Sequence, residues 1–290
     1  MIFDLAFVGH YTKDTIVYPH ATRTVDGGAF NYGAHVAAGM GLRVAVVTRL
    51  AREDWHVVDE LERMGVTVCA RATPVSTLLR LTYPTANLDE RTIELTSSAG
   101  AFTVGEVADL QARAVAIGAS VRGEVPPDVV EALARHGTML ALDVQGFVRV
   151  VRDGRLTFEA WPDMASVLRH VVVLKTDAAE AQLVTGESDH HIAATRLVAL
   201  GPREILLTHA GGVLVHHGGT FDEAPFVPDK VRGRSGRGDT CTAAYLARRL
   251  TAPPAEAVRW AAAVTSLKLE AEGPFRRERA DVEELYRRLF

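Results

Sequence analysis

Short apolar runs alternate with longer segments of helical periodicity along most of this 290-residue chain. Because the runs are apolar at consecutive positions and rich in β-branched residues, they predict strands that are buried on both faces. The segments between them predict helices that cover those strands. The alternation therefore predicts an α/β protein with a mostly parallel central sheet and helices on both faces. The clearest runs are residues 5–9, 44–48, 114–119, 139–144, 170–175 and 204–209.

Two stretches break the alternation and have the pattern of β-hairpins, at about residues 12–25 and 76–95. In the second, LLRLTY and RTIEL flank PTANLDE, whose Pro, Asn and Asp residues favour a turn. With no helix attached, both stretches are predicted to form a small β lid that covers the substrate. An edge extension or a subunit contact, and with it a homodimer through the lid, is an equally supported interpretation. We expect a single domain over residues 1–290.

The composition argues against several classes of protein. The chain has 32 Lys and Arg residues against 36 Asp and Glu residues, a net charge of −4, which disfavours a general nucleic-acid or anionic-membrane binder. No apolar run reaches the roughly 18–20 residues of a membrane span, and residues 1–14 lack the basic start of a signal peptide. Cys69 and Cys241 are too few for a disulfide framework or a cysteine-only zinc site. We expect a cytoplasmic protein with neither nucleic-acid nor membrane partners.

Residues 233–250, GRSGRGDTCTAAYLARRL, place three glycines directly before a helical run. Glycines let the backbone approach a ligand closely, and the free N–H groups of the following helix attract an anion. Asp239 at the start of this helix is either its N-cap or a catalytic carboxylate. Six basic residues between positions 229 and 250 suit a phosphate ligand, although a solvated face has the same composition. The chain has no Walker A sequence, so this is a different kind of phosphate loop.

The same segment resembles the second signature of the ribokinase-like (PfkB) carbohydrate kinases, in which a glycine loop opens a helix. Residues 27–41, GGAFNYGAHVAAGMG, resemble the first signature of that family. The segments KTDAAE (175–180) and THAGG (208–212) are similar to its KPNxxE and nucleotide motifs, and Asp14 matches a substrate-binding Asp after the first strand. The matches span nearly the whole chain in the order of the family and imply a ribokinase-like fold.

The resemblance implies ATP-dependent phosphorylation of an alcohol, with ATP and Mg²⁺ as cofactors. It also implies that Asp239 is the general base, beside an anion hole of backbone N–H groups for the migrating phosphoryl group. The remaining site residues that it implies are Gly236, Arg237 and Gly238 for the anion hole, Lys175, Thr208, Ala210 and Gly212 for ATP, Asp177 and Glu180 for the metal, and Asp14, Gly27, Gly28 and Asn31 for substrate hydroxyls.

The chain departs from the family pattern at three of these positions. Arg237 stands where a small Ala is usual, so the backbone N–H is retained while the side chain adds a charge. Ala210 replaces a Gly of the nucleotide motif, and Asp177 replaces an Asn near the metal.

The stretch LDVQGFVR (142–149) helps to indicate which acceptor substrate the protein uses. It ends a predicted strand with Asp143, which is either a substrate ligand at the carboxyl end of the strand or a local cap. With the GGAFNYGA helix, it resembles the inositol-kinase branch of the family. A phosphosugar would need a basic clamp, and none is assigned outside the ATP loop. We therefore expect a kinase for a small sugar or a cyclic polyol such as myo-inositol. A nucleoside kinase and a sugar- or nucleotide-binding sensor without catalysis are the alternatives.

Two further features have plain structural interpretations. The histidine pairs at 190–191 and 216–217 lack the spacing of a metal site and are predicted to lie at the surface or in loops. Cys241 is predicted to be a small buried helix residue rather than a reactive thiol.

Overall fold

The computed structural model describes residues 2–85, 91–135 and 137–290. Within these residues the central sheet has nine strands in the order β15-β14-β13-β12-β9-β8-β1-β4-β5. The strands from β13 to β5 pair in parallel, and β14 and β15 add an antiparallel edge, which confirms the predicted mostly parallel sheet. The strands are β1 (Phe3–Val8), β4 (Val44–Leu50), β5 (Thr67–Ala72), β8 (Ala112–Ile117), β9 (Met139–Asp143), β12 (Val173–Asp177), β13 (Glu204–Thr208), β14 (Gly212–His217) and β15 (Thr220–Pro225).

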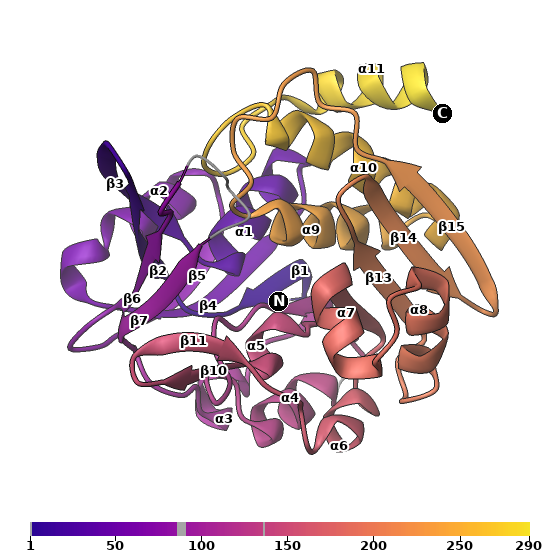
Figure 1. Cartoon of the computed structure of the whole chain (residues 1–290). Helices are drawn as coiled ribbons and strands as arrows, with labels where there is room; N and C mark the ends of the chain where they lie inside the picture. The colour runs from indigo at the N-terminus through magenta and orange to yellow at the C-terminus, as the bar shows by residue number, and fades with distance from the viewer. Residues whose placement is uncertain (1, 86–90, 136) are drawn as a thin grey trace.

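Helices cover both faces of this sheet because its strands are apolar on both sides (Figure 1). In β1, Leu5 and Phe7 belong to one core, whereas Ala6 and Val8 belong to the other. No helix of the described chain is both long and apolar enough to span a bilayer. The first face carries α1 (Ala29–Gly39), α2 (His56–Arg63), α9 (Arg237–Arg249), α10 (Pro254–Leu269) and α11 (Arg279–Leu289), and the second carries α3 (Val104–Val107), α4 (Pro127–Ala134), α6 (Met164–Leu168), α7 (Ala178–Thr185) and α8 (His190–Val198).

A second sheet forms the lid, with the strand order β10-β11-β7-β6-β2-β3 in the part of the chain that the structure describes. The pairs β2–β3 and β6–β7 are antiparallel, and β2 joins β6 in parallel, so both stretches without helices lie in one sheet (Figure 1). Residues 86–90 of the predicted turn lie outside the described residues. The lid strands are β2 (Thr12–Tyr18), β3 (Ala21–Gly27), β6 (Thr77–Thr82), β7 (Thr92–Ser97), β10 (Arg149–Arg152) and β11 (Arg155–Phe158).

The hairpin of β10 and β11 is absent from the expectations drawn from the sequence. Its turn is Asp153–Gly154, where both residues have positive φ angles of 50° and 79°. An Asp-Gly pair between two short apolar runs is a strong hairpin signal, and RVVRDGRLTF carries it. The hairpin follows β9 and the short helix α5 (Gln145–Val148), so the lid is also connected to the main sheet through residues 144–149.

Buried polar contacts fix the base of the lid on the main sheet. The Glu124 carboxylate accepts hydrogen bonds from the backbone N–H groups of His10 and Ser120, both at 2.8 Å. Nδ1 of the His10 ring lies 2.9 Å from Oγ1 of Thr77, the first residue of β6. All four residues are buried, so these contacts hold the ends of β1 and β8 against the beginning of the lid.

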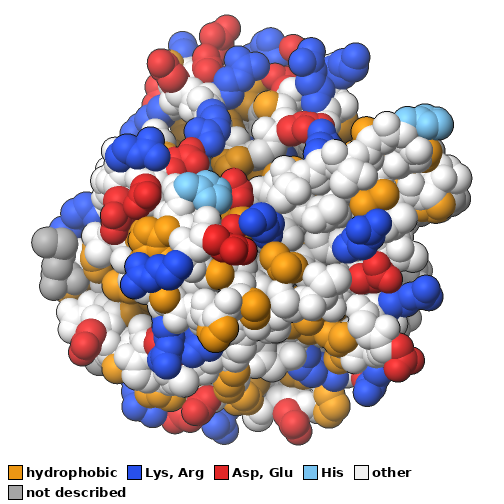
Figure 2. Space-filling view, turned by 90° about the vertical axis from the view of Figure 1, so that its left-hand side faces the viewer, with side chains coloured by type: hydrophobic (Ala, Val, Ile, Leu, Met, Phe, Trp, Pro, Cys, Tyr) orange, Lys and Arg blue, Asp and Glu red, His pale blue; other side chains and the backbone are white. Residues whose placement is uncertain are grey.

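The face of the molecule on the lid side carries basic, acidic and hydrophobic side chains interspersed with one another (Figure 2). In the lid itself, Val151 and Phe158 are exposed, the latter by 53%. The homodimer through the lid stays a prediction.

The helix α9, which begins with the glycine loop, is anchored to β13 by a buried polar cluster. The Tyr245 hydroxyl donates to Oε2 of Glu204 at 2.6 Å, and Nη2 of Arg249 donates to Oε1 at 2.8 Å. Because Glu204 is only 5% exposed, its charge requires these partners.

We expect Tyr245→Phe to lower the free energy of unfolding by about 1–2 kcal/mol, because it removes one hydrogen bond to a buried carboxylate that Arg249 still neutralises. Urea denaturation measures this change. Tyr286→Phe is the matched control, since the Tyr286 ring packs near Trp260 and Phe290, and it should change stability by less than about 0.5 kcal/mol. Identical stability of native protein and Tyr245→Phe would contradict the assigned anchor.

Candidate active site

The glycine loop enters α9 in a conformation that favours glycine. Gly236 is the N-cap with a φ of 72°, and a Cβ at this position would lie 2.1 Å from Cδ1 of Tyr32. A Cβ at Gly238 would lie 2.9 Å from Nζ of Lys175. The main chain of the loop therefore packs directly on two side chains. The N–H groups of Gly238 and Asp239 in the first turn lack intrahelical acceptors and are available to an anion.

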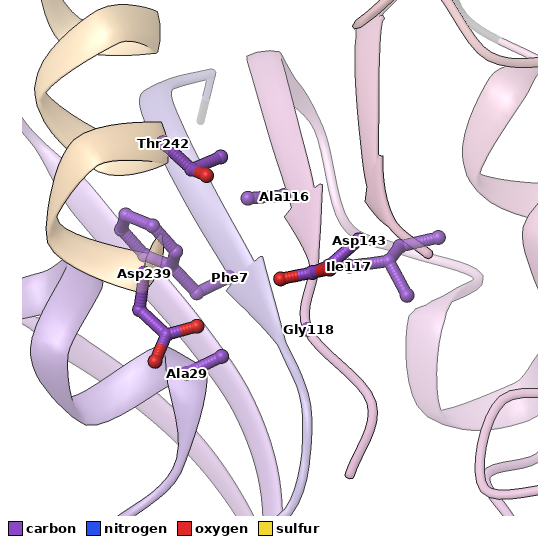
Figure 3. A pocket seen from close by; sticks show the side chains of 8 residues that line it. All are labelled: Phe7, Ala29, Ala116, Ile117, Gly118, Asp143, Asp239 and Thr242. Atoms are coloured by element: carbon purple, nitrogen blue, oxygen red, sulfur yellow. The ribbon is translucent and has the colours of Figure 1, made fainter. Parts of the chain in front are cut away.

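Asp239 lies in the first turn of α9 but does not cap the helix. The N-cap is Gly236, which makes no side-chain capping bond, so the N-cap interpretation of Asp239 is wrong. Its carboxyl group points into a small cavity, with Asp143 from β9 on the other side (Figure 3). Burial raises the pKa of Asp239 to about 6, and the negative charge of Asp143 adds to the shift. Such a carboxyl is ionised at neutral pH and is well matched to accept a proton.

The cavity opens at the carboxyl ends of β8 and β9, where open α/β sheets bind ligands. Asp143 lines it and also caps the next turn, since Oδ1 accepts from the N–H of Gln145 at 3.0 Å. The cap interpretation is therefore confirmed, and contact of Asp143 with a substrate stays a prediction. Most of the other lining residues are not among the sequence predictions, although the rule that sites lie at strand ends points to Ile117 and Gly118. The lining residues are Phe7, Ala29, Ala116, Ile117, Gly118, Asp143, Asp239 and Thr242.

A buried ion pair lies against the glycine loop. Nζ of Lys175 lies 2.9 Å from Oδ2 of Asp143 and 3.8 Å from Oε2 of Glu180, and the lysine is 4% exposed. The parallel register of β9 and β12 places Lys175 beside Asp143. Burial alone would lower the pKa of the ammonium, but the attraction of the two carboxylates outweighs it and raises the pKa. Lys175 is therefore a permanent cation next to the loop, and its contact with ATP stays a prediction.

Asp177 and Glu180, the predicted metal ligands, form a capping box at the start of α7. The N–H of Glu180 donates to Oδ1 of Asp177 at 2.8 Å, and the N–H of Asp177 donates to Oε2 of Glu180 at 2.9 Å. Burial raises the pKa of Glu180 to about 7, and Lys175 opposes that rise. The described residues hold no cluster of three or more metal-ligating side chains. The pair fits Mg²⁺ if phosphate oxygens and water complete the shell, which is its usual coordination in kinases.

The three residues predicted for the nucleotide lie at the turn between β13 and β14. Thr208 is fully buried, and its Oγ1 points to the carbonyl of Thr176 at 3.5 Å. A Cβ at Gly212 would lie 2.4 Å from the carbonyl oxygen of Ala224, so glycine here permits the pairing of β14 with β15. Ala210 is exposed at the tip of the turn. Thr208 and Gly212 thus shape the turn, and contact with ATP stays a prediction.

Arg237 differs from the other loop residues in both its N–H and its side chain. The N–H donates to the carbonyl of Arg234 at 3.2 Å, which leaves the N–H groups of Gly236, Gly238 and Asp239 for the predicted anion hole. The guanidinium lies 6.0 Å from the ring centroid of Phe226, which follows β15. The side chain therefore extends toward the β14–β15 edge of the main sheet rather than toward the lid.

The predicted acceptor residues lie where the lid meets α1. A Cβ at Gly27 would lie 2.9 Å from Oδ2 of Asp14, and Gly28 begins α1 with a φ of 98°. Asn31 donates from Nδ2 to the carbonyl of Asp26 at 3.4 Å. Oδ1 of Asp14 and Oδ1 of Asn31 are buried without any described hydrogen-bond partner. Burial raises the pKa of Asp14 to about 6. Two such buried oxygen atoms suit the hydroxyl groups of a ligand.

The remaining sequence expectations have mixed outcomes. Cys241 is buried, as predicted, and burial raises the pKa of its thiol to about 11. His190 and His191 begin α8 near the surface. His216 is 5% exposed within β14 and packs 4.4 Å from the ring of Phe221, so the surface prediction is wrong for this residue.

We expect Asp239→Asn to raise the free energy of unfolding by about 1–2 kcal/mol above pH 6. The pKa of Asp239 rises from 3.8 to about 6 on folding, so ionisation penalises the folded state above pH 6, whereas below pH 3.8 both states are protonated and the gain vanishes. Urea denaturation at one pH in each range measures the difference. Asp229→Asn, at an exposed position, is the control. A stabilisation that does not depend on pH would contradict the ionisation argument.

Comparison with known proteins agrees with this geometry. The model of the pfkB family carbohydrate kinases matches residues 2–277. A cytidine kinase from Thermococcus kodakarensis is 25% identical over 268 residues, which cover 85% of this chain and 88% of that protein.

Solved structures cover almost the whole chain. A pyrophosphate-dependent kinase of the ribokinase family in a sulfate complex is 35% identical, with a TM-score of 0.90 over 96% of this chain and 99% of the other. A pyrophosphate-dependent kinase of that family, complexed with a pyrophosphate analogue and myo-inositol, is 34% identical, with a TM-score of 0.89 over 97% and 99%. Arabidopsis thaliana ribokinase is 20% identical with a TM-score of 0.79 over 99% of both chains, which shows the shared fold. This chain belongs to the pfkB family of carbohydrate kinases.

Proposed function

We propose that this kinase transfers a phosphoryl group from inorganic pyrophosphate to a hydroxyl of myo-inositol or a closely related cyclic polyol, within a single domain of residues 1–290. The observation that carries the proposal is the placement of the Asp239 carboxyl group, which faces a small cavity at the start of α9. The donor differs from the ATP that the sequence motifs imply. Pyrophosphate is favoured because the two structures at 34–35% identity are pyrophosphate-dependent kinases.

The loop before α9 also supports a donor that consists of phosphate alone. Lys230, Arg232, Arg234 and Arg237 lie within eight residues and precede Asp239. Pyrophosphate is small and highly charged, so it is bound through charge and hydrogen bonds. ATP needs in addition a surface for its base and ribose. A basic loop of this density supplies what pyrophosphate requires.

A neutral polyol suits the acceptor side of the cavity. Asp14 and Asn31 each have a buried oxygen atom that can accept a hydrogen bond from a hydroxyl. One of the solved kinases at 34% identity is complexed with myo-inositol.

The proposed reaction uses Asp239 as general base. The acceptor oxygen bonds to the phosphorus while its proton passes to the Asp239 carboxylate, and the P–O bond to the second phosphate breaks to release inorganic phosphate. The N–H groups of Gly238 and Asp239 stabilise the negative charge on the transferred group. Asp177 and Glu180 would hold Mg²⁺, which neutralises charge on the donor phosphates. Lys175 forms an ion pair with Asp143 and packs against the loop at Gly238.

A nucleoside kinase is the second candidate, because the cytidine kinase of Thermococcus kodakarensis matches 85% of this chain. Its 25% identity is lower than that of the pyrophosphate-dependent kinases, so it ranks below the polyol.

We expect myo-inositol phosphorylation with a kcat/KM about tenfold or more higher for pyrophosphate than for ATP. The measurement is product formation for each donor against a panel of polyols, sugars and nucleosides, including cytidine. Asp239→Asn should lower kcat by about 10²–10⁴ by removing the base, and Asp229→Asn is the control. Preference for a nucleoside would favour the second candidate. Binding of an acceptor without turnover on any donor would indicate a sensor.

We expect Gly236→Ala to lower kcat by about 10²-fold or more, because the new methyl group would collide with Tyr32 and displace the anion hole. Gly65→Ala is the matched control: Gly65 has a φ of 82°, yet nothing lies within 4 Å of its Cβ position. It imposes the same kind of backbone strain away from the site and should leave kcat unchanged. Similar kcat values for both variants would contradict the role of the loop.

A further inference from the structure

Arg149 interacts electrostatically with the acidic residues Glu180, Asp143 and Asp177, and with the basic Arg91, yet it forms an ion pair with none of the three acidic residues. It begins β10 directly after α5, where the chain passes from the end of β9 into the lid. Its Nε atom is buried without a hydrogen-bond partner. Among residues 2–85, 91–135 and 137–290, the structure gives its guanidinium neither a hydrogen bond nor an ion pair. Its Cζ lies 5.7 Å from the ring centroid of Phe158.

The charge of Arg149 acts on both sides of the cavity. It opposes the rise in pKa of Asp14 in the lid, of Asp239 in α9 and of Glu180 in α7. Burial lowers the pKa of the guanidinium itself, and Glu180 counters that effect. Its place in the fold agrees with this, because α5 and Arg149 carry the chain from Asp143, which lines the cavity, into the lid. A phosphoryl group that passes from donor to acceptor crosses the region between the lid and these strand ends.

Arg122 is an arginine of the same region whose guanidinium donates its hydrogen bonds to the protein itself. Its guanidinium donates to the carbonyls of Phe147, Glu159 and Ala160 at 2.6, 3.0 and 2.7 Å. Arg149 has no such acceptors: the residue is only partly exposed and its Nε is buried without a partner, which costs free energy. A ligand anion would remove that cost.

We propose that Arg149 binds the phosphoryl group in transit between pyrophosphate and the acceptor hydroxyl, an inference that rests on the proposed function. The transferred group spreads its charge over three equatorial oxygen atoms. The N–H groups of α9 approach it from one side, and a planar guanidinium can bind two phosphate oxygen atoms at once. Arg149 forms no covalent bond and releases no proton; it stabilises charge while the phosphoryl group passes to the acceptor.

The first test is the kinetics of Arg149→Met with pyrophosphate and myo-inositol. We expect kcat to fall about a thousandfold with little change in the KM for myo-inositol, since an arginine that stabilises phosphoryl transfer contributes about 10³–10⁵ in kcat. Arg149→Lys should recover part of the loss by restoring the charge. Arg152→Met is the matched control, because Arg152 lies in the same strand with its guanidinium exposed and paired with Glu159.

Two readouts separate this role from a structural one. The unfolding temperature of Arg149→Met should equal or exceed that of the native protein, because the variant removes a partly buried charge that forms no ion pair with the described residues. Added guanidinium should raise the kcat of Arg149→Ala at least tenfold and leave the kcat of Arg152→Ala unchanged. A kcat of Arg149→Met within tenfold of the native value, or a loss of activity that only follows loss of folded protein, would overturn the proposal.

Failure of the proposed function gives a different result. If the native protein turns over no acceptor with any donor, calorimetric titration with inorganic pyrophosphate alone decides the role of Arg149. Affinity at least tenfold weaker in Arg149→Met than in Arg152→Met supports it, and equal affinity overturns it.

Discussion

The charge balance around one small cavity is the constraint on which the rest of this site depends. Burial raises the pKa of both Asp14 and Asp239 to about 6, so each carboxylate is ionised at neutral pH at a cost to the folded state. Lys175 offsets part of this negative charge through its contacts with Asp143 and Glu180. The acidic groups are Asp14, Asp143, Asp177, Glu180 and Asp239, and the basic ones are Lys175, Arg149 and Lys268.

This arrangement persists because stable packing surrounds it. The loop before α9 is held by contact of its main chain with Tyr32 and Lys175, and α9 itself is anchored through Tyr245 and Glu204. Two apolar cores, one on each face of the sheet, hold the strands whose ends form the cavity. The free energy of burying these cores supports carboxylates that would each be more stable in water.

The sequence predicts those parts of the fold that follow from local pattern. Continuous apolar runs locate the parallel strands, and the absence of helical periodicity at 12–25 and 76–95 locates most of the lid. The hairpin at Asp153–Gly154 is a missed local signal rather than an unpredictable one. Other features depend on long-range packing, and no local pattern gives them. The main chain at Gly236 packs against Tyr32, which lies about 200 residues earlier in the sequence. Gly236 rather than Asp239 is the N-cap of α9. The environment of Arg149 likewise depends on Asp14, Glu180 and Asp239, which lie on three elements far apart in the sequence.

The position of the glycine loop also bears on which phosphate donor the proposed reaction uses. In the proposed reaction, the N–H groups at the start of α9 bind the group in transit, which is the same phosphoryl group whether the donor is pyrophosphate or a nucleoside triphosphate. These N–H groups and Asp239 would therefore not distinguish one donor from another. Under the proposed function, donor selectivity would depend on side chains around them, such as Arg237 beside Phe226 and Ala210 at the β13–β14 turn. Under the proposed function, the donor changes through such side chains while the backbone of the loop and the base stay constant, so the motifs alone do not distinguish pyrophosphate from ATP.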